Sequence, residues 1–167
     1  TLWANAGTLT TAGSWSSSGA SDLIQVDATG TLNLGGTFTT SAISGNVTRA
    51  TGSTVNLVNT LDLATGSYDL GAAGNIGSLV LLNNAAVQNG TLLTTNATSA
   101  TLASFANVTF TGVTLGNGTA NSGNVTANNG ADLFIGSGGL DLNAGKITLN
   151  DQGSIIMLTL LGNGTQQ

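Results

Sequence analysis

One short pattern occurs twice in this chain, at residues 31–38 and again at residues 54–61. The first copy reads TLNLGGTF and the second reads TVNLVNTL. Repetition with a period of about 20 to 50 residues is typical of solenoids, in which each repeat forms one turn of a coil and equivalent residues stack on one another. This echo therefore favours an elongated coil over a compact globule.

Short apolar–polar–apolar triplets recur along the whole chain, and Gly or Asn separates them. In triplets such as Leu32-Asn33-Leu34 and Val55-Asn56-Leu57, the alternation places both apolar side chains on one face of a strand. Helices are disfavoured because Gly, Asn, Thr and Ser are poor helix formers. We therefore predict an all-β fold, a single-stranded parallel β-helix (β-solenoid) of about seven turns of about 22 to 24 residues, forming one domain over residues 1–167.

The repeat step also predicts which side chains stack inside the coil. Leu32 and Leu34 are expected beneath Val55 and Leu57, with Asn33 beneath Asn56 in an amide ladder. The full predicted stack is Leu32, Leu34, Val55, Leu57, Leu79, Leu81, Leu102, Val125 and Ile147, in which Leu102 aligns with Val125 and then Ile147. A further stack is expected to run from Val113 and Leu115 through Leu133 and Ile135 to Ile155 and Met157.

The composition disfavours several classes of function. The chain has no Cys, His, Glu or Pro, its only cations are Arg49 and Lys146, and its net charge is −5. No nucleic-acid partner is expected because two cations cannot neutralise a phosphate backbone, and without His a proton shuttle at neutral pH has no ready candidate. The longest apolar run, residues 155–161, is shorter than the roughly 20 residues of a membrane helix, so no transmembrane segment is expected.

Residues 29–63 resemble the tandem repeats of giant bacterial surface proteins of the filamentous-haemagglutinin and autotransporter-adhesin type. The resemblance rests on TLNLGGTF at residues 31–38 and on RATGSTVNLVNTLD at residues 49–62, with departures at Ala50, Ser53 and Val58-Asn59. It implies an extracellular, cell-surface β-solenoid. The chain begins at Thr1 and not at Met, so we expect a processed product or one unit of a longer fibre.

The expected function is structural and not enzymatic: a subunit or repeat of a bacterial surface fibre, stalk or adhesin shaft. The expected partner is the same chain, stacked end to end as a homopolymer or joined in tandem, with surface glycans or other cells as further partners. No catalytic residue, cofactor or metal is expected. The apolar run near the C-terminus is the predicted stacking end and comprises Ile155, Ile156, Met157, Leu158, Leu160 and Leu161.

Two alternatives start from other residues. A carbohydrate-active β-helix, resembling a polysaccharide lyase or hydrolase, would need paired carboxylates; the candidate pairs are Asp22 with Asp27, Asp62 with Asp69, and Asp132 with Asp141. An ice-binding solenoid would need a flat face of ranked Thr-x-Thr strings; the candidates start at Thr8, Thr29, Thr37 and Thr109, and their spacing predicts that only some lie in register.

Three weaker patterns have simpler explanations. Gly138-Gly139-Leu140-Asp141 resembles part of a calcium-binding nonapeptide but does not recur. Asn-x-Thr sequons are numerous, as expected from the abundance of Asn, Thr and Ser. The seven aromatic side chains are scattered, which indicates core or corner filling and not a sugar-stacking row.

Overall fold

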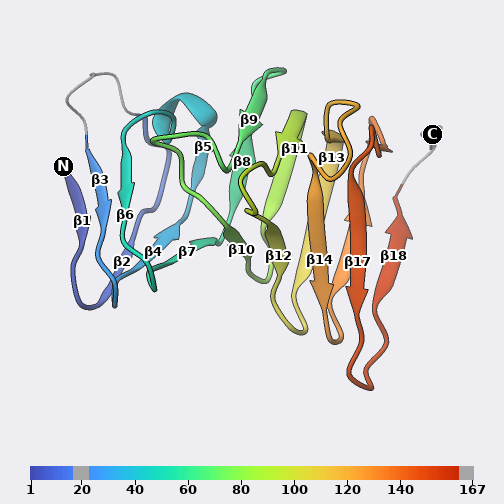
Figure 1. Cartoon of the computed structure of the whole chain (residues 1–167). Coiled ribbons are helices and arrows are strands. Elements are labelled where there is room, and N and C mark those ends of the chain that lie inside the picture. The colour runs from blue at the N-terminus through green and yellow to red at the C-terminus, as the bar shows by residue number, and fades with distance from the viewer. Residues whose placement is uncertain (17–22, 162–167) are drawn as a thin grey trace.

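The computed structural model describes residues 1–16 and 23–161, which coil into a parallel β-solenoid of about seven turns. Successive turns lie side by side, with β1 (Leu2–Ala4) and β18 (Met157–Leu160) at opposite ends of the stack (Figure 1). The described residues contain no α-helix, and one 3-10 turn covers Thr40–Ala42. The predicted fold class is confirmed.

Three sheets run along the axis of the coil, and we call them A, B and C. Sheet A contains β1, β3 (Ile24–Val26) and β6 (Val47–Arg49). Sheet B contains one strand from each of seven turns: β2 (Thr8–Thr10), β4 (Thr31–Leu34), β7 (Thr54–Leu57), β10 (Leu79–Leu81), β12 (Ala100–Leu102), β14 (Asn124–Asn128) and β17 (Lys146–Asn150). Sheet C contains β5 (Thr37–Thr39), β8 (Thr60–Asp62), β11 (Ala86–Leu93), β13 (Asn107–Leu115), β15 (Asp132–Ile135) and β18, with β9 (Ser67–Asp69) beside β11 and β16 (Leu140–Asp141) beside β13.

The core is a set of aliphatic ladders, which are rows of inward-facing side chains at equivalent positions of successive turns. In sheet B, Leu32 pairs with Val55 and Leu34 pairs with Leu57, and all four side chains are 0% exposed. Leu57 then pairs with Leu81, which pairs with Leu102. The stacking predicted for the first turns is therefore the stacking observed.

One predicted step between later turns of sheet B is wrong. Leu102 pairs with Ala127 and not with Val125, which pairs with Ala100 instead, so the sequence alignment slipped by two residues. The next step, from Val125 to Ile147, is as predicted. A slip of two keeps every side chain on the same face, which is why an aliphatic residue still fell on an aliphatic one.

Sheet C shows a second error. Leu133 and Ile135 lie on Val108 and Phe110, and not on Val113 and Leu115. Strand β13 carries these two buried pairs on either side of a corner at Gly112, where φ is +59°. The predicted stack used the pair after the corner, whereas β15 lies on the pair before it.

The final step of the same predicted stack is also wrong. Leu158 and Leu160 lie above Leu133 and Ile135, where Ile155 and Met157 were expected. The connection from sheet B to sheet C explains the shift, because it contains two residues between β4 and β5 but six between β17 and β18. The longer connection holds Ile155 outside the strand.

Glycine occupies corners where neighbouring turns approach closely. Gly36 has φ of +76°, and a Cβ at this position would overlap the backbone of Gly13 in the turn before. Its backbone amide donates to Asn59 Oδ1 in the turn after, at 3.1 Å. Such corners permit the tight stacking that the ladders require.

Candidate functional site

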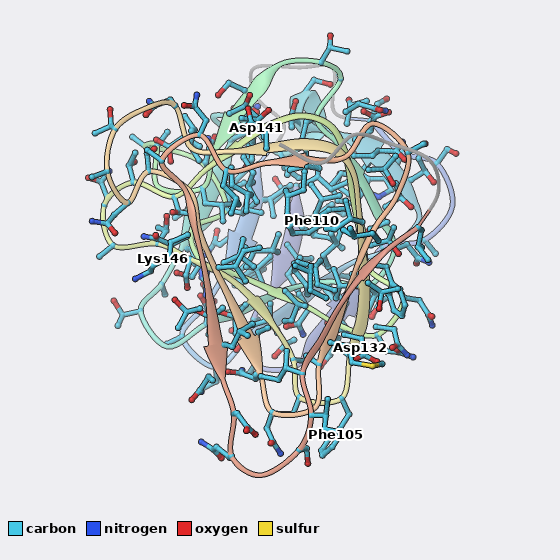
Figure 2. The ribbon with its side chains drawn as sticks, turned by 90° about the vertical axis from the view of Figure 1, so that its right-hand side faces the viewer. Phe105, Phe110, Asp132, Asp141 and Lys146 are labelled. Carbon is cyan, nitrogen blue, oxygen red and sulfur yellow. The ribbon has the colours of Figure 1, made fainter. Side chains whose placement is uncertain are left out.

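The last turn of the solenoid exposes the ends of the aliphatic ladders. Leu158 and Leu160, above the buried Leu133 and Ile135, are 57% and 54% exposed, and Leu149, above Ala127, is 60% exposed. Figure 2 looks onto this end, where β17 and β18 form the open edges of sheets B and C. Within the described residues, neither strand edge has a further parallel partner. This end is therefore both apolar and rich in unpaired backbone groups.

The structure places the six residues of the predicted stacking end in different environments. Only Leu158 and Leu160 end inward ladders. Met157 pairs with Asp132 on the outward face of sheet C, and Ile155 lies in the long corner between β17 and β18. The side chain of Ile156 is partly buried and packs against the core. The backbone amide of Leu161 donates to Ile135 O at 2.6 Å.

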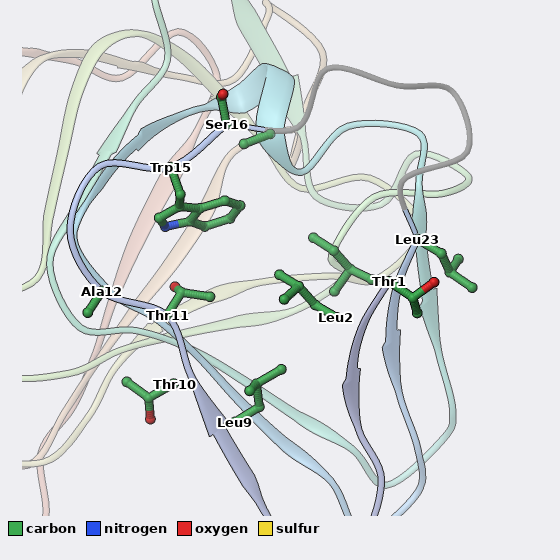
Figure 3. A pocket seen from close by; sticks show the side chains of 11 residues that line it. Thr1, Leu2, Leu9, Thr10, Thr11, Ala12, Trp15, Ser16 and Leu23 are labelled. Carbon is green, nitrogen blue, oxygen red and sulfur yellow. The ribbon is translucent and has the colours of Figure 1, made fainter.

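The first turn has a hollow of about 450 Å³ at the opposite end. Leu2, Leu9, Trp15 and Leu23 are among the side chains that line it (Figure 3). The Trp15 ring is fixed in place because it stacks on Phe38 at 4.6 Å between centroids and its indole nitrogen donates to Gly35 O at 2.9 Å. The two ends thus differ in shape: protruding aliphatic side chains at one, an apolar hollow at the other.

The residues of the predicted stack lie between these ends on the inward face of sheet B. Leu32, Leu34, Val55, Leu57, Leu79, Leu81, Leu102 and Val125 are at most 1% exposed. Ile147, in the last turn, is partly buried against the same core. These side chains fill the interior of the coil, and the surface is formed by their outward neighbours.

The carboxylates serve as hydrogen-bond acceptors for the turns. Asp69 Oδ1 accepts from the amides of Gly71 at 2.9 Å and Thr95 at 3.1 Å, and Oδ2 accepts from the Thr95 hydroxyl at 2.6 Å. Burial alone would raise the pKa of Asp69, but these hydrogen bonds from Thr95 and Gly71 outweigh it and lower the pKa below its ordinary value. A carboxylate held in this way is a poor general base or acid at neutral pH.

Asp62 shows the same balance. It accepts from the amide of Ala64 at 2.8 Å and from the side chains of Gln88 and Asn89 at 3.2 and 3.3 Å. The cost of partial desolvation would raise its pKa, and the hydrogen bonds lower it below the ordinary value. Both residues therefore tie one turn to the next.

The structure does not bring Asp62 and Asp69 together on one face. They pair with Gln88 and Leu93 of β11, on either side of a corner at Asn89 and Gly90, where φ is positive. Outward side chains on opposite sides of a convex corner point away from each other, and the two carboxylates share no hydrogen-bond partner.

The other candidate pair that lies within the described residues, Asp132 with Asp141, is also separated by a corner. Asp132 and Asp141 pair with Asn107 and Thr114 of β13, on either side of the corner at Gly112. Figure 2 shows their labels on different sides of the molecule. Asp22, the proposed partner of Asp27, lies outside the described residues.

Asp27 and the cation Arg49 have other surroundings. Asp27 accepts from the indole nitrogen of Trp3 at 2.9 Å and from Gln25 Nε2 at 3.0 Å. Arg49 donates to Ile76 O at 2.9 Å, Ser78 O at 2.5 Å and both oxygens of Ser53. Burial lowers the pKa of the Arg49 guanidinium. Its hydrogen bonds join β6, the last strand of sheet A, to residues 76–78 of the following turn.

The remaining candidate motifs do not form a site. Asp141 of the Gly-Gly-Leu-Asp string lies in β16, and the described residues contain no group of three or more His, Cys, Asp or Glu side chains that could hold a metal ion. No helix in the described ranges is long and apolar enough to cross a membrane.

The outer face of sheet B carries two rows of mostly polar side chains, which we call ranks. One rank runs Thr10, Asn33, Asn56, Val80, Thr101, Thr126, Thr148, and the other begins Thr8, Thr31, Thr54. Asn56 Nδ2 donates to Asn33 Oδ1 at 2.8 Å, which is the predicted amide ladder.

These ranks do not form the paired rows of hydroxyls expected of an ice-binding face. Thr37 and Thr109 lie in sheet C, and Thr29 precedes β4. Among the described strands of sheet B, a Thr-x-Thr string occurs only at Thr8. On every described strand of sheet B except β2, Thr therefore occupies at most one of the two outward rows.

Sequence reasoning identified the apolar run at the last turn but missed the hollow at the first. The one sequence signal for the hollow was Trp15, a large aromatic in a segment otherwise made of small residues.

Comparisons with protein-family models, with curated proteins and with solved structures give no match.

Proposed function

We propose that the chain is a structural, non-enzymatic segment of an extracellular β-solenoid shaft, such as a bacterial surface fibre, stalk or adhesin. The observation that carries the proposal is sheet B, which contributes a strand to each of seven turns over a buried aliphatic ladder. The resemblance of residues 29–63 to tandem repeats of bacterial surface proteins supports the extracellular location.

The geometry suits a shaft because its cohesive interactions are aligned with the long axis. Backbone hydrogen bonds join each strand to the strand one turn away, and the ladders bury apolar surface between the same turns. Side chains such as Asp69 and Asn56 add hydrogen bonds in the same direction. Further turns, either in tandem or from another copy, extend this arrangement without a new type of contact.

The carbohydrate-active alternative has less support. Glycoside hydrolysis uses two carboxyl groups that flank one bond, within about 10 Å of each other, whereas each described pair is divided by a corner of the coil. Asp62 and Asp69 are also engaged with the turns, and Arg49 is engaged with backbone and hydroxyl oxygens. The ice-binding alternative lacks paired Thr ranks on sheet B.

Immunoelectron microscopy of the native material tests the proposal. Antibodies raised against the outer face of sheet B should label thin fibres outside the cell along their length. Labelling confined to the cell interior, or to isolated globular particles, would contradict a shaft. Incubation of the purified chain with a panel of polysaccharides, followed by product analysis, tests the enzymatic alternative, for which we expect no cleavage.

A further inference from the structure

We propose that copies of this chain associate head to tail, with the exposed ladder ends of the last turn seated in the hollow of the first turn of the next copy. This inference rests on the proposed function, since it names the partner at the end of the shaft. It differs from a covalent tandem array, in which the next turn belongs to the same chain.

Complementary shape is the first argument. Leu149, Leu158 and Leu160 protrude at one end, each more than half exposed, while the hollow of about 450 Å³ opens between Leu2, Leu9 and Trp15 at the other. An apolar protrusion that fits a pocket elsewhere on the same molecule makes a heterologous contact, which does not close and so produces a filament.

Strand register is the second argument. In sheet B the inward ladder begins at Leu9 and ends at Ile147, because Leu9 pairs with Leu32 and Val125 pairs with Ile147. When β17 pairs in parallel with β2 of the next copy, Ile147 meets Leu9 and Thr148 meets Thr10 of that copy. At these two positions an aliphatic side chain meets an aliphatic one and a hydroxyl meets a hydroxyl, while Leu149 meets Thr11, which also lines the hollow.

Sheet C continues in the same arrangement. The bridge between Ser14 and Thr37 places Trp15 at the start of the ladder that runs through Phe38 and Leu61. The same ladder reaches Ile135 and Leu160 at the last turn. Leu160 therefore meets the Trp15 ring of the next copy when Ile147 meets Leu9, so that one placement satisfies both sheets.

The direction of the strands is the third argument. Head-to-tail contact keeps all strands parallel, as they are within the chain. Contact between two last turns would require antiparallel pairing and would leave the hollow empty.

The inward side of β17 presents Ile147 and Leu149, while the cation Lys146 lies on the outward face, so no charge on this strand opposes the contact.

Blocking each end separately tests the inference by sedimentation velocity. Leu158→Asp introduces a charge on the inward side of the last turn, and Leu2→Asp introduces one in the hollow. We expect the unmodified chain to form concentration-dependent filaments, each variant alone to remain monomeric, and an equimolar mixture to form a dimer, since each variant keeps one intact end. Thr159→Asp and Thr8→Asp, on the outward faces of β18 and β2, are the matched controls and should still polymerise.

Association of Leu2→Asp with itself would overturn the inference in favour of contact between two last turns. An unmodified chain that stays monomeric at millimolar concentration would also overturn the inference. The proposed function would survive that result as a covalently continuous shaft, which the labelling of native fibres tests separately. Circular dichroism checks that each variant is folded.

A cross-linking experiment tests the same register without disturbing the apolar contacts. The chain contains no Cys, so single replacements are unambiguous. Thr10→Cys and Thr148→Cys chains, when mixed and oxidised, should form a disulfide between copies, because adjacent strands lie about 4.8 Å apart, within the Cα range of a disulfide. Thr148→Cys alone should not form one; if it cross-links as efficiently as the mixture, the head-to-tail register is wrong.

Discussion

Single residues at the corners determine how closely two turns approach. Gly36 illustrates this role, since its backbone conformation and its contact with Gly13 both exclude a side chain. Asp69 illustrates another, since its carboxylate joins the turn of β9 to Thr95 of the next turn. These interactions lie outside the aliphatic core but act along the same axis.

Gly36→Ala tests the close approach of turns. Gly45 has the same φ of +76° but open space around its Cβ, so Gly45→Ala serves as the matched control. Both replacements incur about 1–2 kcal/mol for the left-handed backbone, and Gly36→Ala adds about 1–3 kcal/mol of steric overlap. Chemical denaturation should show the larger loss for Gly36→Ala, and equal losses would mean that the turns are not in contact there.

Asp69→Asn tests the acid dependence of stability. The pKa of Asp69 is lowered in the folded chain from the unfolded value of about 3.9. The native state therefore binds fewer protons, so this stabilisation is present above about pH 4 and is lost as the pH falls through the lower folded pKa.

Asp69→Asn should accordingly unfold at a temperature that depends less on pH between about pH 4 and pH 2. Thermal unfolding followed by circular dichroism at several pH values gives this dependence. The unmodified chain, measured in the same buffers, is the reference. Identical slopes for the unmodified chain and Asp69→Asn would contradict the assigned role of Asp69.

At the scale of the element, each strand is too short to be stable alone and depends on the ladder it joins. Strands of sheet B contain three to five residues; each of the five inner strands buries two side chains, and the end strands β2 and β17 bury none fully. Their stability therefore comes from neighbours one turn away and not from local contacts.

Leu57→Ala and Leu149→Ala compare the middle and the end of one ladder. Leu57 is 0% exposed and Leu149 is 60% exposed. We expect Leu57→Ala to lower the free energy of unfolding by about 2–5 kcal/mol, and Leu149→Ala to lower it by less than about 1 kcal/mol in the monomer. Urea denaturation measures both; comparable losses would mean that the last turn is covered.

Sequence periodicity predicted the fold class and the first ladders because the step between turns is constant there. Thr8, Thr31 and Thr54 are evenly spaced in the sequence and pair in consecutive strands. From β10 onward the step varies: the interval from Leu79 to its partner Ala100 is shorter than the interval from Ala100 to Val125. Corner loops absorb these differences, and a period-two strand pattern cannot reveal a slip of two residues.

The candidate site was predicted only in part for a related reason. The apolar residues 155–161 are visible as a run in the sequence, but which of them face inward depends on the register of β18 with β15. The hollow at the first turn depends on the position of Trp15 against Phe38, which belongs to the next turn. Neither relation follows from composition.

At the scale of the whole molecule, one sheet extends through every turn and keeps its register despite changing loop lengths. The outward residues of sheet B, from Thr10 through Asn56 and Thr101 to Thr148, form one continuous row of paired positions along the axis. Their spacing should depend on the number of turns and not on the number of residues between them. This property is what allows an irregular sequence to form a regular shaft.

Distances between paired spin labels test this claim most directly. Labels on Cys introduced at Thr10 and Thr101, four turns apart, and at Thr10 and Thr148, six turns apart, should differ in separation by about 10 Å, since each turn adds about 4.8 Å. Samples diluted with unlabelled chain at low concentration report distances within one copy. A difference of this size supports the stacked coil, whereas equal distances for the two pairs, or a shorter one for Thr148, would contradict it.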